Sequence, residues 1–136
     1  MNLLLPYYVA IPLGLAFLIT LLSKWWKGSG EVLATGGMAV LAAMALGSIG
    51  SPSSSYHMGG WIPPVGIALM SDGLTVLLLI AVNVVGFLCI LFSLRYMRAY
   101  TGLDKYYALF MLLITGMNGL VVTADVFNMF VFLEIA

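Results

Sequence analysis

Long apolar stretches alternate with short polar segments along this chain of 136 residues. The apolar stretches predict four helices long enough to cross a bilayer and a partial fifth helix. We place these helices at residues 3–22, 32–49, 73–94, 106–123 and 126–136. The pattern therefore predicts an all-α integral membrane protein, with one membrane domain over residues 1–136.

Composition supports a lipid environment. Hydrophobic residues make up 63% of the chain and charged residues only 7%, whereas a soluble domain carries about 25% charged residues. The charged side chains gather between the apolar stretches. The net charge is zero, so electrostatics gives no argument for nucleic acid as a partner, and the lipid bilayer is the expected surroundings.

Residues 50–72 have a different character from the rest of the chain. This segment opens with serines and a proline and contains Gly59, Gly60, Pro63 and Pro64, which favour turns and extended backbone over helix. We predict an irregular outer loop over the bundle, with room for a short hairpin. Trp61 is expected to lie at the level of the lipid headgroups.

The basic residues predict the orientation. All five lie in two of the connections between helices: Lys24, Lys27, Arg95, Arg98 and Lys105. The other connections contain no lysine or arginine, and basic residues concentrate on the cytoplasmic side of a membrane. We therefore expect the N-terminus outside, and a multi-pass protein in the inner (cytoplasmic) membrane of the cell.

Glu134 is the leading candidate for function. It lies in the apolar run 126–136, in which the other polar side chain is Asn128. As a helix, this run would extend about 16 Å and would place Glu134 about 13 Å beyond Asp125, near the middle of a hydrocarbon core about 30 Å thick. A charge there costs roughly 2.5–3.5 kcal/mol. We therefore expect the rest of this helix, and a partner for Glu134, in another polypeptide or in a continuation of this one.

A carboxyl group at that depth can act in proton transfer, because a nearby cation changes its affinity for a proton. The alternative for Glu134 is an acid at a helix end, solvated by a cavity or by headgroups, with no role in transport. The other candidates for a polar pathway are Asn83, Asn118, Asn128 and Asp125.

The four candidates differ in kind. Asn83 and Asn118 line a water path or, as is more common for such residues, form hydrogen bonds between helices. Asn128 lies six residues before Glu134 and so on a different helical face. Asp125 suits a helix cap at the outer surface. We find no metal-ligand spacing and no nucleophile–base pair, and we predict no cofactor and no catalytic site in this chain.

Two stretches resemble a known family. They are MGGWIPPVGIALMSDGLTVLLL (residues 58–79) and YYALFMLLITGMNGLVVTADVFNMFVFLEIA (residues 106–136). Both are similar to the N-terminal part of the antiporter-like proton-translocating subunits found in Mrp antiporters, membrane-bound hydrogenases and complex I. The acidic end FVFLE is the most specific element. The resemblance implies that Glu134 pairs with a lysine from a later helix, which another membrane subunit of the same complex would have to supply.

The resemblance implies a component of a multi-subunit complex. That component would form part of a proton or sodium/proton antiporter-like module, coupled to a redox complex or to an Mrp-type antiporter. A structural or assembly subunit without its own ion pathway is the alternative. A third reading is a subunit of an oxidoreductase that binds a quinone between helices.

Overall fold

The computed structural model describes residues 4–61 and 66–136 and is mostly helical. Its five α-helices are α1 (Tyr7–Leu22), α2 (Ser29–Gly47), α3 (Gly73–Tyr96), α4 (Leu103–Val122) and α5 (Val126–Ile135). Three of them, α2, α3 and α4, are long and apolar enough to cross a membrane. The 16 residues of α1 and the 10 of α5 form shorter apolar helices.

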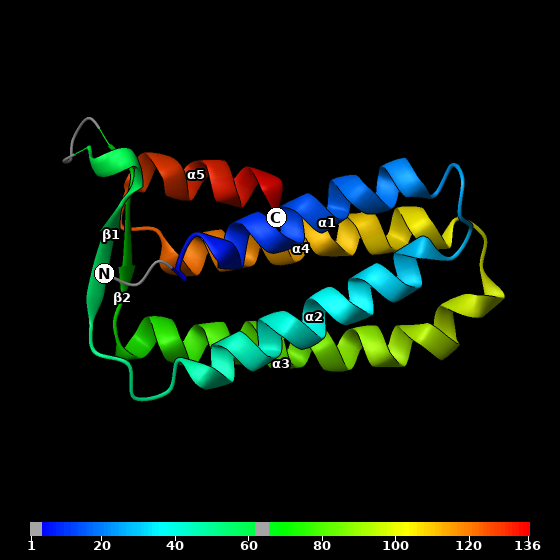
Figure 1. Cartoon of the computed structure of the whole chain (residues 1–136), viewed down its shortest axis with the longest axis horizontal. Helices are drawn as coiled ribbons and strands as arrows, with labels where there is room; N and C mark the ends of the chain where they lie inside the picture. Colours follow the sequence, from blue (N-terminus) through cyan, green and yellow to red (C-terminus); the bar gives the residue numbers. More distant parts are fainter. Residues whose placement is uncertain (1–3, 62–65) are drawn as a thin grey trace.

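The helices run roughly along one axis (Figure 1). α1 packs most extensively along α4, and α2 packs most extensively along α3. α5 lies against α4 and ends part-way along the bundle (Figure 1). The shared core contains fully buried side chains from four helices, among them Ile19, Met38, Leu41, Leu79 and Met111.

Caps define where two of the helices begin. The side chain of Asp72 accepts a hydrogen bond from the Thr75 backbone N–H at 2.8 Å, as predicted for the start of α3. That bond favours the ionised carboxylate, so it lowers the pKa of Asp72 below its ordinary value of 3.8. Asp125 accepts from the Phe127 N–H at 3.0 Å and caps α5 in the same way.

The expected all-α architecture needs one correction. Strands β1 (Ser54–His57) and β2 (Ala68–Ser71) form an antiparallel hairpin, with Ser54 opposite Ser71 and His57 opposite Ala68. The hairpin lies across one end of the bundle (Figure 1). It also holds the α4–α5 connection, because the Ala124 N–H donates to the Ala68 carbonyl at 2.9 Å. Trp61 is exposed, while Leu3 and Pro63–Pro64, used in the predictions, lie outside the described residues.

Helix boundaries differ from the predicted ones mainly at the end of the bundle opposite the hairpin. α2 begins at Ser29 and not at residue 32, and α4 begins at Leu103 and not at residue 106. Gly28 and Gly102 precede these helices with φ of 93° and 84°, a backbone conformation that glycine adopts without strain. The longer helices bring Glu31 and Asp104 into first turns.

Candidate functional site

Glu134 is held by the packing of α5 on α4. Phe132 is the buried apolar anchor of α5, and its ring rests on Gly119 of α4, where a side chain would collide with it. One turn earlier in α4, a Cβ on Gly116 would come within 2.7 Å of the Ala136 backbone nitrogen. The two glycines therefore allow the end of α5 to lie directly on the backbone of α4.

The Glu134 carboxylate lies on the opposite, uncovered side of α5. Its side chain is exposed, and so are its helical neighbours Phe127, Phe130 and Val131. Residues three, four and seven apart share one helical face, so the acid belongs to an apolar face that includes two aromatic rings. Among the described residues, no lysine or arginine forms an ion pair with Glu134.

Asn83 and Asn118 meet in the core, and both are fully buried. The Asn83 amide donates to Oδ1 of Asn118 at 2.9 Å, and the Asn118 amide donates back to Oδ1 of Asn83 at 3.1 Å. The second hydrogen of Asn83 goes to the Leu79 carbonyl at 2.8 Å. The pair thus forms the interhelical hydrogen bonds that were the commoner expectation, while a water path through it stays a prediction.

The second hydrogen of the Asn118 amide reaches a third helix. It donates to the Tyr8 backbone carbonyl of α1 at 3.1 Å. In a regular helix that carbonyl would accept from the N–H four residues later, but the residue there is Pro12, which has no N–H. α1 continues through Pro12, and Asn118 satisfies the carbonyl that the proline leaves free.

The other two predicted polar residues lie apart from this pair, at the start of α5. Asn128 is buried and donates to Oγ1 of Thr123 at 3.1 Å. Asp125 caps the helix, as described above. Asn128 faces α4 while Glu134 faces away from the bundle, so the structure does not bring Glu134 together with any of the four other candidates.

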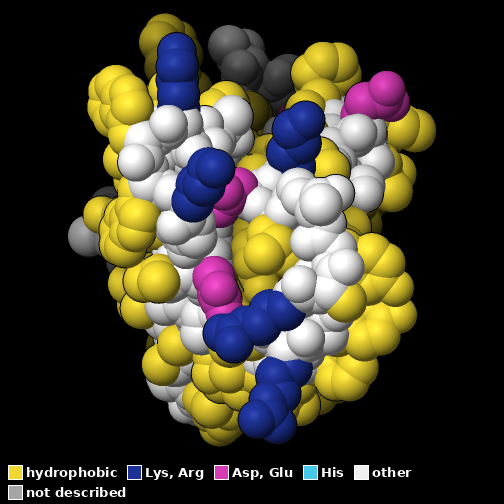
Figure 2. Space-filling view, turned by 90° about the vertical axis from the view of Figure 1, so that its right-hand side faces the viewer, with side chains coloured by type: hydrophobic (Ala, Val, Ile, Leu, Met, Phe, Trp, Pro, Cys, Tyr) yellow, Lys and Arg dark blue, Asp and Glu magenta, His cyan; other side chains and the backbone are white. Residues whose placement is uncertain are grey.

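A charged network at the basic end was not predicted. The Asp104 carboxylate accepts from the Gly30 N–H at 3.1 Å and links α4 to the first turn of α2. Arg98 forms an ion pair with Glu31 at 3.1 Å. Lysine and arginine side chains spread over this end of the bundle with acidic side chains among them, while the flanks are hydrophobic (Figure 2). The apolar run beginning at Val32 concealed the acids, because the helices start earlier than that run.

An α-helical bundle with apolar flanks and a charged end is the architecture of a multi-pass membrane protein. Residues 61–107 match the family described as "NADH-Ubiquinone oxidoreductase (complex I), chain 5 N-terminus". NADH-quinone oxidoreductase subunit N of Desulforudis audaxviator is 35% identical over 107 residues, which cover 77% of this chain and 21% of that protein. The D-type component of a probable K(+)/H(+) antiporter of Rhizobium meliloti is 37% identical over 94 residues, covering 69% and 17%.

Two solved structures contain the same fold. One is the membrane-bound sulfane sulfur reductase, an archaeal respiratory membrane complex, with a TM-score of 0.87 and 31% identity over 97% of this chain and 28% of the matched chain. The other is the Mrp complex from Dietzia sp., with a TM-score of 0.86, 26% identity and coverage of 99% and 26%. The chain belongs to the antiporter-like membrane subunits and matches their N-terminal part. It spans 17–21% of the length of the two curated relatives described above.

Proposed function

We propose that this chain forms the N-terminal part of an ion-translocating subunit in a multi-subunit membrane complex, with Glu134 as a proton-transfer group. The relatives are subunits of NADH-quinone oxidoreductase and of cation/proton antiporters, and both structural neighbours are membrane complexes. The module would move protons, or exchange sodium for protons, and would be coupled to a redox complex or to an Mrp-type antiporter.

The exposed position of Glu134 on an apolar face carries this proposal. α5 is fixed to α4 through Phe132, while the acid and the rings of Phe127 and Phe130 face outward. An ionised carboxylate among such side chains at membrane depth needs a cation or water. All five basic residues of the chain belong to the two connections at the other end of the bundle. A lysine from a later helix or from another subunit would complete the pair and set the proton affinity of Glu134.

The membrane topology is part of the same proposal. With α1 counted as a fourth span and α5 as a partial fifth, the basic end faces the cytoplasm and the hairpin faces outward. The N-terminus then lies outside, and the membrane is the inner (cytoplasmic) one. The 16 residues of α1 rise about 24 Å, so crossing a core of about 30 Å requires residues before Tyr7 or local thinning of the bilayer.

The test is Glu134→Gln in the assembled complex, reconstituted into vesicles. We expect loss of coupled ion movement with assembly intact, because glutamine keeps the size of the side chain and cannot exchange a proton. Asp125→Asn is the matched control, since it changes a carboxylate of the same chain that caps a helix, and transport should persist. Normal transport by Glu134→Gln would remove the proton-transfer role and leave the alternative of an assembly subunit.

A further inference from the structure

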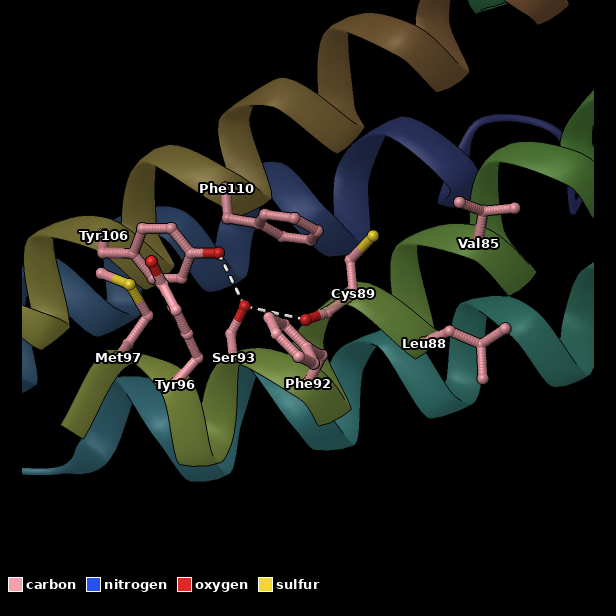
Figure 3. Close-up of a pocket in the computed structure, with 9 residues that line it drawn as sticks. All are labelled: Val85, Leu88, Cys89, Phe92, Ser93, Tyr96, Met97, Tyr106 and Phe110. Carbon is pink, nitrogen blue, oxygen red and sulfur yellow. Dashed lines mark hydrogen bonds between the residues drawn. The ribbon is translucent and has the colours of Figure 1, made fainter. Parts of the chain in front are cut away.

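An apolar groove runs between α3 and α4 on the flank of the bundle. Its larger part, of about 590 Å³, is lined by nine residues: Val85, Leu88, Cys89, Phe92, Ser93, Tyr96, Met97, Tyr106 and Phe110. A second hollow of about 340 Å³ shares Val85, Cys89 and Phe110 with it and continues to Met117. We call the two together the α3–α4 groove. Figure 3 shows Tyr106 and Phe110 of α4 opposite Cys89 and Ser93 of α3.

We propose that the α3–α4 groove binds one acyl chain of an anionic phospholipid, with the phosphate at the basic end of the bundle. The lining from Val85 to Met97 follows twelve helical steps, or about 18 Å. One leaflet of hydrocarbon is about 15 Å deep, half of a core of about 30 Å. The groove therefore has the length of a chain that crosses one leaflet, and its volume falls within the usual range for ligand sites.

The shape of the groove favours a slim occupant over a helix. Gly86 and Ser93 form a buried floor, whereas Leu88, Phe92 and Tyr96 stand exposed along one side. Helices that pack in membranes approach one another over small residues, and this tall, largely aromatic rim would keep a second helix away from the floor. A flexible hydrocarbon chain fits between such side chains without displacing them.

Charge favours an anionic headgroup. The polar part of the groove lies at its basic end, where the Ser93 hydroxyl and the Tyr106 hydroxyl are hydrogen-bonded at 2.8 Å. Arg95 lies beside Tyr96 and is exposed, and it forms no ion pair with any residue in ranges 4–61 and 66–136. Arg98, by contrast, is bound to Glu31. Arg95 is therefore the cation available to a lipid phosphate at the mouth of the groove.

Lipid retention by the purified full chain tests this proposal. The protein is incubated in detergent with equal amounts of phosphatidylglycerol and phosphatidylcholine, and the retained lipids are counted by native mass spectrometry. We expect wild type to retain phosphatidylglycerol preferentially and Arg95→Gln to reduce that preference about fivefold. Lys24→Gln, which removes a charge from the same end but away from the groove, should leave the preference unchanged. An equal effect of the two substitutions would overturn the site.

Cys89 gives a second measurement that does not depend on a variant. It is the one cysteine of the chain and its thiol is accessible, so alkylation by N-ethylmaleimide reports occupancy of the groove. Phosphatidylglycerol should slow alkylation in wild type, and Arg95→Gln should abolish most of that protection. Equal protection by phosphatidylcholine would show ordinary lipid-exposed surface and would contradict the proposal, as would protection by neither lipid.

Discussion

Asn83 and Asn118 use all four of their amide hydrogens in the centre of the bundle. Two of these hydrogens join the side chains to each other, one goes to Leu79 within α3, and one goes to Tyr8 in α1. The pair therefore connects three helices at a point that is fully buried. In an apolar surrounding each of these groups is costly to leave unpaired, so the pair fixes how α1, α3 and α4 meet.

Replacing one asparagine of the pair should destabilise the bundle. Asn118→Leu leaves the Tyr8 carbonyl and Oδ1 of Asn83 without partners, and we expect a loss of about 1–3 kcal/mol in the free energy of unfolding. Asn83→Leu keeps the bond to Tyr8 and should cost less. Unfolding in mixed micelles, followed by circular dichroism, measures both values.

The double variant provides the control for this interaction. With both residues changed to leucine, no unpaired amide remains, so the cost should be smaller than the sum of the single costs. Coupling between polar side chains in membrane proteins averages about 0.6 kcal/mol and reaches about 1.7 kcal/mol. Strict additivity of the two substitutions would show that the hydrogen bonds between them add no stability.

Pro12 and Asn118 should also be coupled, although they lie on different helices. Pro12→Ala provides a backbone N–H that can donate to the Tyr8 carbonyl, which now accepts from Asn118. In the Asn118→Leu background this new bond should recover about 1 kcal/mol of the loss. The same unfolding measurement on the two single variants and the double variant gives the coupling. Equal effects of Pro12→Ala in both backgrounds would contradict this account of the Tyr8 carbonyl.

The position of Glu134 depends on a glycine. A methyl group at Gly119 would collide with the Phe132 ring, so Gly119→Ala should move α5 off α4 and cost about 1–3 kcal/mol. Limited proteolysis of the α4–α5 connection reports that release directly. Adding Phe132→Ala should relieve the collision and restore protection of the connection, although the smaller side chain packs less surface.

Gly36→Ala is the matched control for Gly119→Ala. It also lies inside a helix, but nothing stands within 4 Å of its added Cβ. Alanine there should be neutral or stabilising by up to about 1 kcal/mol, because glycine is unfavourable in a helix interior. Equal proteolysis of the two variants would mean that the contact between Gly119 and Phe132 does not hold α5.

Hydropathy was sufficient to predict the helices and their order. It also located the start of α3 at Asp72 and of α5 at Asp125, because each acid precedes an apolar run and suits a cap. The bond from Asn118 to Tyr8 was out of reach, since it joins residues 110 positions apart. Pro12 carried a signal nonetheless: a proline inside a helix leaves one carbonyl free, and a buried asparagine elsewhere can satisfy it.

The basic end shows why helix starts were harder to predict than spans. Glu31 and Asp104 are polar, so the apolar pattern placed them in loops, whereas acids are favourable in the first turn of a helix. Gly28 and Gly102 were the available signal, because each precedes a helix with a positive φ. The position of Glu134 on the uncovered side of α5 could not be read from the sequence either, because it depends on which face Gly119 receives.

The two acidic contacts of the basic end should differ in strength. Asp104 is partly buried and satisfies a backbone N–H of α2, so Asp104→Ala should cost about 0.5–2 kcal/mol, as loss of a helix cap does. The Arg98–Glu31 pair is open to solvent, with 69% and 30% of the side chains exposed. Arg98→Gln should therefore change the free energy of unfolding by less than about 1 kcal/mol.

Salt separates the two contacts. Raising the ionic strength to about 1 M shortens the Debye length to about 3 Å, so any effect of Arg98→Gln should disappear. The effect of Asp104→Ala should largely persist, because the lost group is the acceptor of a short hydrogen bond at the first turn of a helix. Asp104→Asn keeps an oxygen acceptor in the same place and should recover part of the stability. If Asp104→Ala proved as salt-sensitive and as mild as Arg98→Gln, the carboxylate would be acting only as a surface charge, and α2 would not depend on α4 for its first turn.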